Sequence, residues 1–302
     1  MTSQTITAAA SGTWTLGDRT VNRIGFGAMR LPQSGEALIP DAVPRDREEA
    51  IGVLRRAREL GVNHIDTAAF YFSPLRSANE LINRALAPYP DDLVIATKVG
   101  PGRDPSGAWS PHATAEQLRG QVEENLRQLG RDHLDVVNLR IVGTGSIAER
   151  FGALAELRRA GLIRHLGLSN IHPHQLAEAQ AIAPVVCVQN MYGIGVRPEQ
   201  DAFLRTCGEQ GIAFVPFYAI AGTGREAGAS GGDSAEVLAL ARAHAVSAAQ
   251  VRLAWTLHQG PHVLAIPGTG DPEHLAANVA AGALRLSADE LALLDSVHRR
   301  AA

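Results

Sequence analysis

Cysteine is scarce in this chain of 302 residues, which holds only Cys187 and Cys207. Two cysteines so far apart favour neither a disulfide framework nor a thiolate metal site, and we expect both to pack as small core hydrophobes in a reducing cytosol. No apolar run approaches the roughly 18 residues that a membrane-spanning helix needs. Residues 1–11 lack the basic and apolar regions of a signal peptide and are expected to form a flexible tail. These absences predict a cytoplasmic protein without a membrane partner.

An excess of charge of one sign is also absent, because 28 Lys+Arg residues face 31 Asp+Glu residues and leave a formal net charge of −3. This near-neutral balance gives no general attraction for nucleic acid. Hydrophobic residues make up 45 % of the chain, which is enough for a large core. The length suits two average domains or one α/β barrel of roughly 250 residues with additions. Since no linker interrupts the chain, we expect a single domain over 1–302, with a monomer as the default state.

Eight short apolar stretches alternate with helical patterns along the chain. The predicted strands are 24–28, 63–67, 93–98, 134–139, 164–168, 185–189, 213–217 and 263–266. The predicted helices are 45–60, 78–87, 114–129, 147–159, 173–180, 199–210 and 235–259, the last with a break near Val246 and Ser247, followed by 272–281 and 287–300. Most of the strands are continuous apolar runs, which are typical of parallel strands covered on both faces. Eight such units in a chain of this length predict a (β/α)8 barrel.

The glycine pattern after the first predicted strand argues against the main alternative fold. An open doubly wound sheet usually carries G-x-G-x-x-G there, and the run Gly25-Phe26-Gly27-Ala28-Met29-Arg30 lacks the third glycine. A β-hairpin is expected before this strand, with arms 13–16 and 21–24 around a turn rich in Gly and Asp. The long segments 31–44 and 221–234 break the alternation and are expected to lie over the barrel mouth.

Three side chains of complementary chemistry lie at or just after the ends of consecutive predicted strands. Asp66 lies near the end of one strand, Tyr71 follows five residues later, and Lys98 closes the next strand. A phenol ionises near pH 10 in water; a nearby ammonium stabilises its phenolate form, and a carboxylate holds the ammonium charged and in place. The trio therefore suits a general acid that protonates a carbonyl oxygen as hydride arrives. No side chain delivers hydride, so a nicotinamide or flavin is required.

Each of these side chains taken alone has a plainer interpretation. Asp66 would cap the following segment, Lys98 would form an exposed ion pair, and Tyr71 would pack on the surface. Their joint placement at adjacent strand ends favours a single site instead, because barrel enzymes do their chemistry at the carboxyl ends of their strands.

Polar and aromatic side chains at later strand ends form a candidate nicotinamide site. Ser169 and Asn170 follow one strand and Gln189 ends the next, and their side chains offer the donors and acceptors that a carboxamide needs. Phe217 and Tyr218 end a further strand, where a flat ring would stack. Each of these features is weak alone, and together they predict a site for the ring end of a dinucleotide.

Two stretches further along are candidate phosphate sites. The loop beyond the aromatic pair contains Gly222, Gly224 and Gly228, whose backbone amides would be able to approach a pyrophosphate. The run Ile266-Pro267-Gly268-Thr269-Gly270 precedes a helix expected to start near Pro272, and a helix N-terminus is a ready anion site. In chain order, these groups would line a dinucleotide from its nicotinamide to its adenosine phosphate.

At these residues the chain resembles the aldo-keto reductase family over essentially its whole length. The matching motifs are Ile65-Asp66-Thr67-Ala68 with Tyr71, Thr97-Lys98, Ile163-Arg164-His165-Leu166-Gly167-Leu168-Ser169-Asn170, Val188-Gln189-Asn190, and Ile266-Pro267-Gly268-Thr269 with Asn278. The resemblance implies a (β/α)8 barrel that reduces aldehydes and ketones with NADPH held in an extended pose. It also implies that Asp66, Tyr71 and Lys98 are three of the family's four catalytic residues.

The fourth catalytic position departs from the family pattern. The family usually has a histidine at the end of the strand after the lysine strand, whereas here Asn138-Leu139 leads to Arg140. A guanidinium stays charged at any working pH, so Arg140 is suited to hold a substrate oxygen and not to shuttle a proton. This ending, with Pro216-Phe217 and Pro267-Gly268-Thr269, resembles the branch containing bacterial pyridoxal reductases. The resemblance makes pyridoxal, reduced to pyridoxine, the leading substrate.

The resemblance also gives the expected contacts to NADPH or NADP+. Many family members hold the 2′-phosphate with a lysine after the proline and an arginine further on, where this chain has Gly268 and His274. Thr269, His274, backbone amides and Arg225 are the remaining candidates for that phosphate, and Asn278 matches the residue that meets adenine. The expected cofactor-binding residues are Gly27, Ala28, Met29, Asp66, Ser169, Asn170, Gln189, Phe217, Tyr218, Ala219, Ile220, Gly222, Ile266, Gly268, Thr269, Gly270, His274 and Asn278.

Two other functions are compatible with these residues. One is a nucleotide-binding regulatory barrel with little turnover, like the channel subunits among the family's relatives. The other is a sugar or polyol dehydrogenase that runs the same hydride chemistry in reverse. The pair His172 and His174 is expected to belong to a solvated helix start, and no metal site is expected. The sequence thus predicts an NADPH-dependent reductase of a small-molecule carbonyl, with no nucleic-acid partner.

Overall fold

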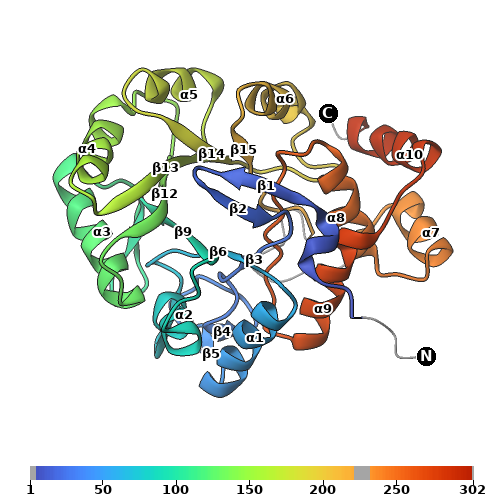
Figure 1. Ribbon diagram of the computed structural model, residues 1–302, viewed down its shortest axis with the longest axis horizontal. Coiled ribbons are helices and arrows are strands. Elements are labelled where there is room, and N and C mark those ends of the chain that lie inside the picture. Colours follow the sequence, from blue (N-terminus) through green and yellow to red (C-terminus); the bar gives the residue numbers. More distant parts are fainter. Residues whose placement is uncertain (1–4, 221–231, 301–302) are drawn as a thin grey trace.

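The computed structural model describes residues 5–220 and 232–300, and its centre is a curled parallel sheet enclosed by helices (Figure 1). Seven strands pair in the order β15-β14-β13-β12-β9-β6-β3, each parallel to its neighbour. The apolar runs are buried as predicted, and Val136 and Val137 are fully buried. The strands are β3 (Phe26–Gly27), β6 (His64–Asp66), β9 (Val94–Val99), β12 (Leu134–Arg140), β13 (Ile163–Ser169), β14 (Val185–Gln189) and β15 (Ala213–Phe214).

The eighth predicted strand closes the ring through isolated bridges. Val263 pairs with Phe214 of β15 on one side, and Ala265 pairs with Ile24 on the other. The Leu264 N–H donates to the Phe214 carbonyl at 2.9 Å, and the Gly25 N–H donates to the Ala265 carbonyl at 2.8 Å. This segment therefore bonds to both of its neighbours, and the predicted (β/α)8 barrel is confirmed.

Helices cover the outer face of the sheet, and local signals fix their ends. Gly61, with φ +79°, follows α1, and a capping box of Ser287 and Glu290 begins α10. The predicted break near Val246 is confirmed, because Ser247 caps a new helix. The helices are α1 (Arg47–Glu59), α2 (Ala78–Leu86), α3 (Ala115–Leu129), α4 (Ala148–Arg159), α5 (Pro173–Gln180), α6 (Asp201–Glu209), α7 (Ala235–Ala243), α8 (Ala248–His258), α9 (Pro272–Ala280) and α10 (Ala288–Arg299).

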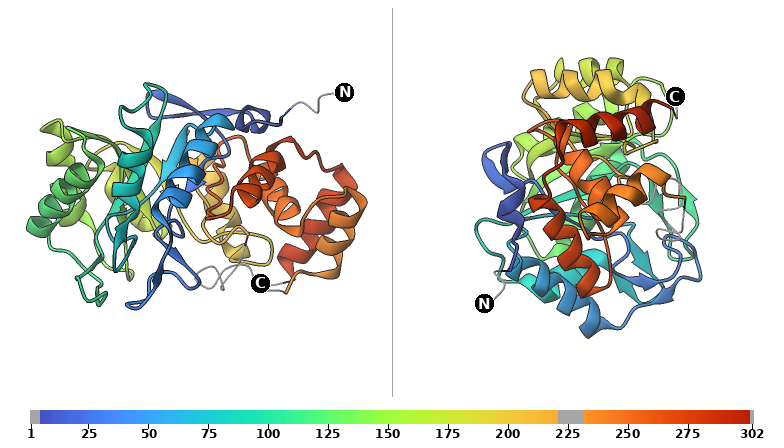
Figure 2. Two further views of the ribbon diagram at one scale, coloured as in Figure 1. Left: turned by 90° about the horizontal axis from the view of Figure 1, so that it is seen from below. Right: turned by 90° about the vertical axis from the view of Figure 1, so that its right-hand side faces the viewer.

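The predicted hairpin lies across one end of the barrel (Figure 2). It consists of β1 (Thr13–Leu16) and β2 (Arg19–Asn22), so its second arm begins two residues earlier than expected. Gly17 has φ +68°, which permits a tight two-residue turn. Leu16 and Val21 pack in one buried cluster with barrel residues that include Val94 and Leu264. The hairpin therefore closes the amino end of the barrel and leaves the carboxyl end for a site.

The expectation of a flexible tail over 1–11 is wrong for its last residues, because Ala8–Ser11 form the 3-10 helix η1. Ala8 is fully buried, and its N–H donates to the Leu60 carbonyl at 2.8 Å. η1 packs on the short helix η4 (Ala281–Ala283), where a Cβ added to Gly282 would lie 2.8 Å from the Ser11 Cβ. The small side chains of this segment allow the close packing.

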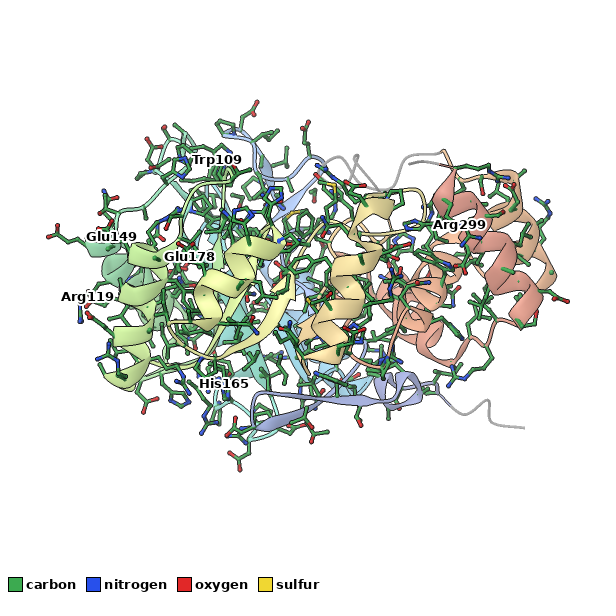
Figure 3. The ribbon with its side chains drawn as sticks, turned by 90° about the horizontal axis from the view of Figure 1, so that it is seen from above. Trp109, Arg119, Glu149, His165, Glu178 and Arg299 are labelled. Atoms are coloured by element: carbon green, nitrogen blue, oxygen red, sulfur yellow. The ribbon has the colours of Figure 1, made fainter. Side chains whose placement is uncertain are left out.

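Short hairpins follow the first barrel strands and surround the mouth. The segment 31–44 holds β4 (Gln33–Ser34) and β5 (Val43–Pro44), and β7 (Phe72–Ser73) pairs with β8 (Arg76–Ser77). β10 (Gly102–Arg103) pairs with β11 (Trp109–Ser110). Figure 3 shows Trp109 at the end of the barrel opposite His165, which contacts Asp18 of the β1–β2 hairpin. The other predicted mouth segment, 221–234, falls largely outside the described residues.

Both cysteines are free and buried, Cys187 in β14 and Cys207 in α6. Burial raises the pKa of each thiol to about 12. The prediction that they pack as core hydrophobes is confirmed. Over residues 5–220 and 232–300, none of the helices combines the length and the hydropathy that a membrane crossing requires.

His64 of β6 is a buried histidine whose two ring nitrogens have no hydrogen-bond partner in the described segments. Its ring lies against Gly25, where an added Cβ would come within 2.2 Å of the Nε2 atom. Burial lowers the pKa of His64 from 6.5 to about 4. As the pH falls, His64 is therefore protonated in the unfolded chain before it is protonated in the folded protein. Its contribution to the free energy of unfolding is complete above pH 6.5 and decreases as the pH falls toward 4.

We expect the cost of His64→Leu in free energy of unfolding to be about 2 kcal/mol smaller at pH 5 than at pH 8, because leucine removes the proton uptake of the unfolded state. Urea unfolding of both proteins at the two pH values measures this difference. His112→Leu, at an exposed histidine, is the control and should show no such change. An equal cost at both pH values would contradict the burial argument.

Candidate active site

The carboxyl ends of the barrel strands border a cavity of about 610 Å³. This volume lies in the range of small-molecule and cofactor sites. The cavity brings together side chains from both halves of the chain. Of the residues predicted for the site, those in its wall are Gly27, Met29, Asp66, Tyr71, Lys98, Arg140, Gln189, Phe217, Tyr218, Ala219, Ile220, Ile266, Gly268, Thr269, Gly270, His274 and Asn278.

Asp66 and Lys98 form a buried ion pair between adjacent strands β6 and β9. Lys98 Nζ donates to Asp66 Oδ1 at 2.7 Å and to Oδ2 at 2.6 Å, and also to the Thr67 carbonyl at 3.0 Å. The side chains are only 3 % and 7 % exposed for lysine and aspartate. Gln189 of β14 donates from Nε2 to Asp66 Oδ1 at 2.8 Å. The pair is therefore well satisfied, and the plainer interpretation of Lys98 as an exposed ion pair is wrong.

Tyr71 lies beside this pair and borders the cavity. The Lys98 Nζ atom is 4.9 Å from the centroid of the Tyr71 ring, and the Phe70 ring packs edge-on at 5.2 Å. The residue is only 5 % exposed, which excludes the surface packing that the plainer interpretation gave it. The Tyr71 hydroxyl makes no hydrogen bond to another described residue, so it is available to a molecule in the cavity.

Arg140 ends β12 at the position where the family pattern has a histidine. Its Nη1 donates to Ser169 Oγ at 3.1 Å, and its guanidinium lies 5.0 Å from the centroid of the Phe217 ring. The β12–β13 register places Arg140 directly opposite Ser169. Arg140 thus brings a permanent positive charge to the cavity, and its guanidinium is positioned by the Ser169 hydroxyl and the Phe217 ring.

Some predicted cofactor contacts do not reach the cavity wall. Ser169 is fully buried against Arg140, and Asn170 donates from Nδ2 to the Ile141 carbonyl at 2.9 Å. Ala28 is fully buried, and its N–H donates to the Asp66 carbonyl at 2.8 Å. These residues lie behind the wall, where other parts of the protein engage their polar groups. The residues predicted for the glycine-rich loop lie outside the described residues: Gly222, Gly224, Arg225 and Gly228.

Gln189, Phe217 and Tyr218 form the part of the wall that suits a flat polar ring. The Gln189 side-chain oxygen accepts no hydrogen bond from another described residue, since only its Nε2 is engaged by the protein. The Phe217 and Tyr218 rings lie 5.4 Å apart at an angle of 51°. Tyr218 has φ +74°, a strained backbone conformation that turns this segment at the cavity wall.

The far end of the cavity is built from backbone in close contact. A Cβ added to Gly27 would lie 2.6 Å from the Ile266 carbonyl oxygen, and one added to Gly268 would lie 2.5 Å from the Gly27 carbonyl oxygen. These two glycines are therefore required by packing between the first and last strand segments. A lysine at position 268, as in many family members, would need a different backbone path here.

The start of α9 differs from the open helix N-terminus that the sequence suggested. Asp271 is the N-cap and accepts hydrogen bonds from the Glu273 N–H at 2.7 Å and the His274 N–H at 3.4 Å. Thr269 Oγ1 accepts from the Asp271 N–H at 3.0 Å. The first amides of the helix are thus already bonded, and the expectation of a ready anion site is wrong for them. The His274 side chain is 75 % exposed.

Sequence reasoning missed several residues of the wall: Arg30, Arg45, Ser247, Ala249, Pro267, Asp271 and Ala277. Asp271 carried a recognisable signal, because an aspartate before a proline is a typical helix N-cap. Ser247 and Ala249 carried none, since they reach the cavity only because α8 packs at the mouth. Arg45 was predicted to begin the helix 45–60, but Asp46 caps α1 and the helix begins at Arg47, so Arg45 precedes the helix and borders the cavity.

A parallel barrel with an acid, an ammonium and a phenol at the carboxyl ends of its strands defines an oxidoreductase of the α/β-barrel class. The chain belongs to the aldo/keto reductase family, whose model matches residues 23–299. It is 43 % identical over 297 residues to the pyridoxine 4-dehydrogenase of Escherichia coli (strain K12), covering 96 % of this chain and 99 % of that protein. It is 31 % identical over 279 residues to the methylglyoxal reductase of the same organism, covering 90 % and 93 %.

Solved structures share the same fold. An aldo-keto reductase from Klebsiella pneumoniae in complex with NADPH superposes with a TM-score of 0.78 at 27 % identity, covering 95 % of this chain and 94 % of that one. The resemblance to the family that the sequence motifs indicated is therefore confirmed.

Proposed function

We propose that this enzyme reduces a small aldehyde with NADPH, with Tyr71 as the general acid, and that pyridoxal, reduced to pyridoxine, is its leading substrate. The observation that carries the proposal is the buried Asp66–Lys98 pair next to a tyrosine hydroxyl that has no hydrogen-bond partner among residues 5–220 and 232–300. The 43 % identity to a pyridoxine 4-dehydrogenase supports the choice of substrate. The NADPH complex of the Klebsiella structure supports the choice of cofactor.

The cavity residues fit a nicotinamide dinucleotide. The Gln189 carbonyl oxygen would bind the carboxamide, and Phe217 and Tyr218 offer ring faces for the nicotinamide. Thr269 and Asn278 at the far end would hold the adenosine part, beside the wall segments that Gly27 and Gly268 allow to pack closely. When bound, NADPH supplies the hydride that no side chain can supply.

The chain's own residues handle the proton. Tyr71 donates its hydroxyl proton to the carbonyl oxygen while the new C–H bond forms, so the substrate becomes an alcohol and Tyr71 becomes a phenolate. The Lys98 ammonium next to the ring stabilises that phenolate. Asp66 holds Lys98 in place with two short hydrogen bonds, so the ammonium needs no reorganisation during the reaction. Water then restores the Tyr71 proton through the open cavity.

Arg140 has a different part in this proposal, because its guanidinium carries a permanent charge. It would bind and orient a substrate oxygen, and its contacts with Ser169 and Phe217 limit the directions in which it points. A phenolic or hydroxyl oxygen next to the reacting aldehyde, as in pyridoxal, would suit this donor. The regulatory alternative has no observation in its favour, whereas the cavity-facing Tyr71 favours turnover.

We expect NADPH oxidation with pyridoxal to exceed that with simple aldehydes of similar size in kcat/KM, because Arg140 gives the hydroxylated ring an extra charge-assisted hydrogen bond worth about 1.5–3 kcal/mol. The decrease of NADPH absorbance with a carbonyl panel measures this preference, and Arg140→Met should remove it. Equal turnover of all aldehydes would agree with the reductase activity and would contradict pyridoxal as the preferred substrate. NADPH binding without turnover of any carbonyl would contradict the proposed function itself.

A further inference from the structure

Arg45 lies in the cavity wall and has no carboxylate within ion-pair distance among the described residues. It precedes α1 and contacts the segment before α9: its Nη1 donates to the Gly270 carbonyl and its Nη2 to the Gln33 carbonyl, each at 3.3 Å. Its Nε is buried and has no hydrogen-bond partner in the described segments. Its two long bonds to neutral carbonyls still leave one N–H on each Nη atom for a ligand.

The surroundings of Arg45 are otherwise unfavourable to an anion. Asp271 and Glu273 place two carboxylates at the start of α9, and Asp271 already occupies the first amides of that helix. Hydrogen bonds from the Glu273 and His274 backbone lower the pKa of Asp271, with a smaller contribution from the Arg45 charge. The aspartate is therefore ionised at neutral pH. A phosphate bound near this helix start would need a strong cation to offset these charges.

Among the described residues, the wall holds two other arginines, and both are engaged elsewhere. Arg140 contacts Ser169 at the catalytic end of the cavity, and Arg30 donates to the Gly35 carbonyl at 2.8 Å. His274 has a largely exposed side chain that lies 3.8 Å from the Asp271 carboxylate. Arg45 is thus the arginine of the wall that touches the Gly270 segment.

We infer that Arg45 binds the 2′-phosphate of NADPH and makes the enzyme prefer the phosphorylated dinucleotide. The inference rests on the proposed function, because it places the adenosine end of the cofactor at Thr269 and Asn278. A phosphate monoester is close to doubly charged at neutral pH, and a guanidinium matches its oxygens with paired donors. Arg45, which contacts Gly270 from the segment before α1, thereby takes the part that a lysine at 268 or an arginine at 274 has in many family members.

Gly270 is the residue that makes room for this guanidinium. A Cβ added to Gly270 would lie 2.1 Å from Arg45 Cζ, and its backbone does not have the positive φ that requires glycine. Alanine at 270 is therefore compatible with the fold and would force the Arg45 side chain to move. The contact between Arg45 and Gly270 is therefore testable by substituting either residue.

Calorimetric titration with NADP+ and with NAD+ tests the inference without turnover. Arg45→Met should weaken NADP+ binding about 10- to 100-fold and change NAD+ binding less than about 3-fold, since one charge-assisted contact to the 2′-phosphate is lost. Arg45→Lys should recover part of the loss and make binding more sensitive to salt. Arg47→Met, at an exposed arginine outside this cavity, is the matched control and should bind both dinucleotides as the parent does.

Two further variants distinguish phosphate binding by Arg45 from a purely structural role of this residue. Gly270→Ala should reproduce the selective loss for NADP+. Asp271→Asn keeps an N-cap residue and removes a negative charge, so it should tighten NADP+ binding by several fold and leave NAD+ binding unchanged.

Equal weakening of NADP+ and NAD+ in Arg45→Met would overturn the inference and assign Arg45 to the pyrophosphate or to loop structure. Unchanged NADP+ binding would overturn it as well. Both results leave the proposed function intact, because the parent still binds NADP+. A parent that binds neither dinucleotide would instead refute the proposed function.

Discussion

Tyr71→Phe is expected to lower kcat for aldehyde reduction by about 10²- to 10⁴-fold while leaving NADPH binding within about two-fold of the parent. The hydroxyl is the only part removed, and it makes no hydrogen bond to another described residue, so the fold loses little. The Phe70 contact with the ring is retained. The effect should therefore fall on the chemical step and spare binding.

Steady-state kinetics and NADPH fluorescence titration measure the two quantities separately. Tyr89→Phe is the control, because the Tyr89 hydroxyl donates to the Leu129 carbonyl at 2.7 Å and does not border the cavity. That variant should keep its turnover and lose a little stability. Parent-like turnover by Tyr71→Phe would remove the tyrosine from the mechanism and leave no general acid at this position.

Lys98→Met is expected to abolish turnover and to lower the free energy of unfolding by about 3–5 kcal/mol. The substitution leaves the Asp66 carboxylate buried, with the Gln189 amide in place of a cation. Asp66→Asn should destabilise the protein in the same range, since it leaves the ammonium without its counter-charge. The loss is a desolvation effect, and it does not measure what the intact pair contributes to stability.

A double-mutant cycle with urea unfolding distinguishes this explanation from simple loss of packing. Asp66→Asn combined with Lys98→Met removes both charges, so it should be more stable than the sum of the single losses predicts by at least about 2 kcal/mol. It should remain inactive. Additive losses would show that the two side chains stabilise the fold independently, which would contradict the ion-pair description.

The barrel was predictable because its local signals agree with one another. Continuous apolar runs such as Val136 and Val137 required burial on both faces, and Ser247 and Ser287 marked helix starts. Asp66 and Lys98 were predictable as a pair for a related reason. Adjacent parallel strands bring their carboxyl ends together whatever the intervening helix does.

The remaining site was not predictable because it depends on how far individual side chains reach. Ser169 ends its strand at the mouth as predicted, but its hydroxyl accepts a hydrogen bond from Arg140 and the residue lies behind the cavity wall. Asp271 changes the start of α9 from an anion site to a capped helix. Arg45 was predicted to lie in the helix 45–60, but Asp46 caps α1, and Arg45 borders the cavity from the segment before the helix.

The measurement that most directly tests the central claim is the fate of deuterium from NADPH labelled at both C4 positions, with pyridoxal as the substrate. If the site performs hydride transfer with Tyr71 as the acid, mass spectrometry should find one deuterium on the carbinol carbon of pyridoxine, and Tyr71→Phe should form that product far more slowly. Pyridoxine without the label, or no product from a protein that binds NADPH, would contradict the account.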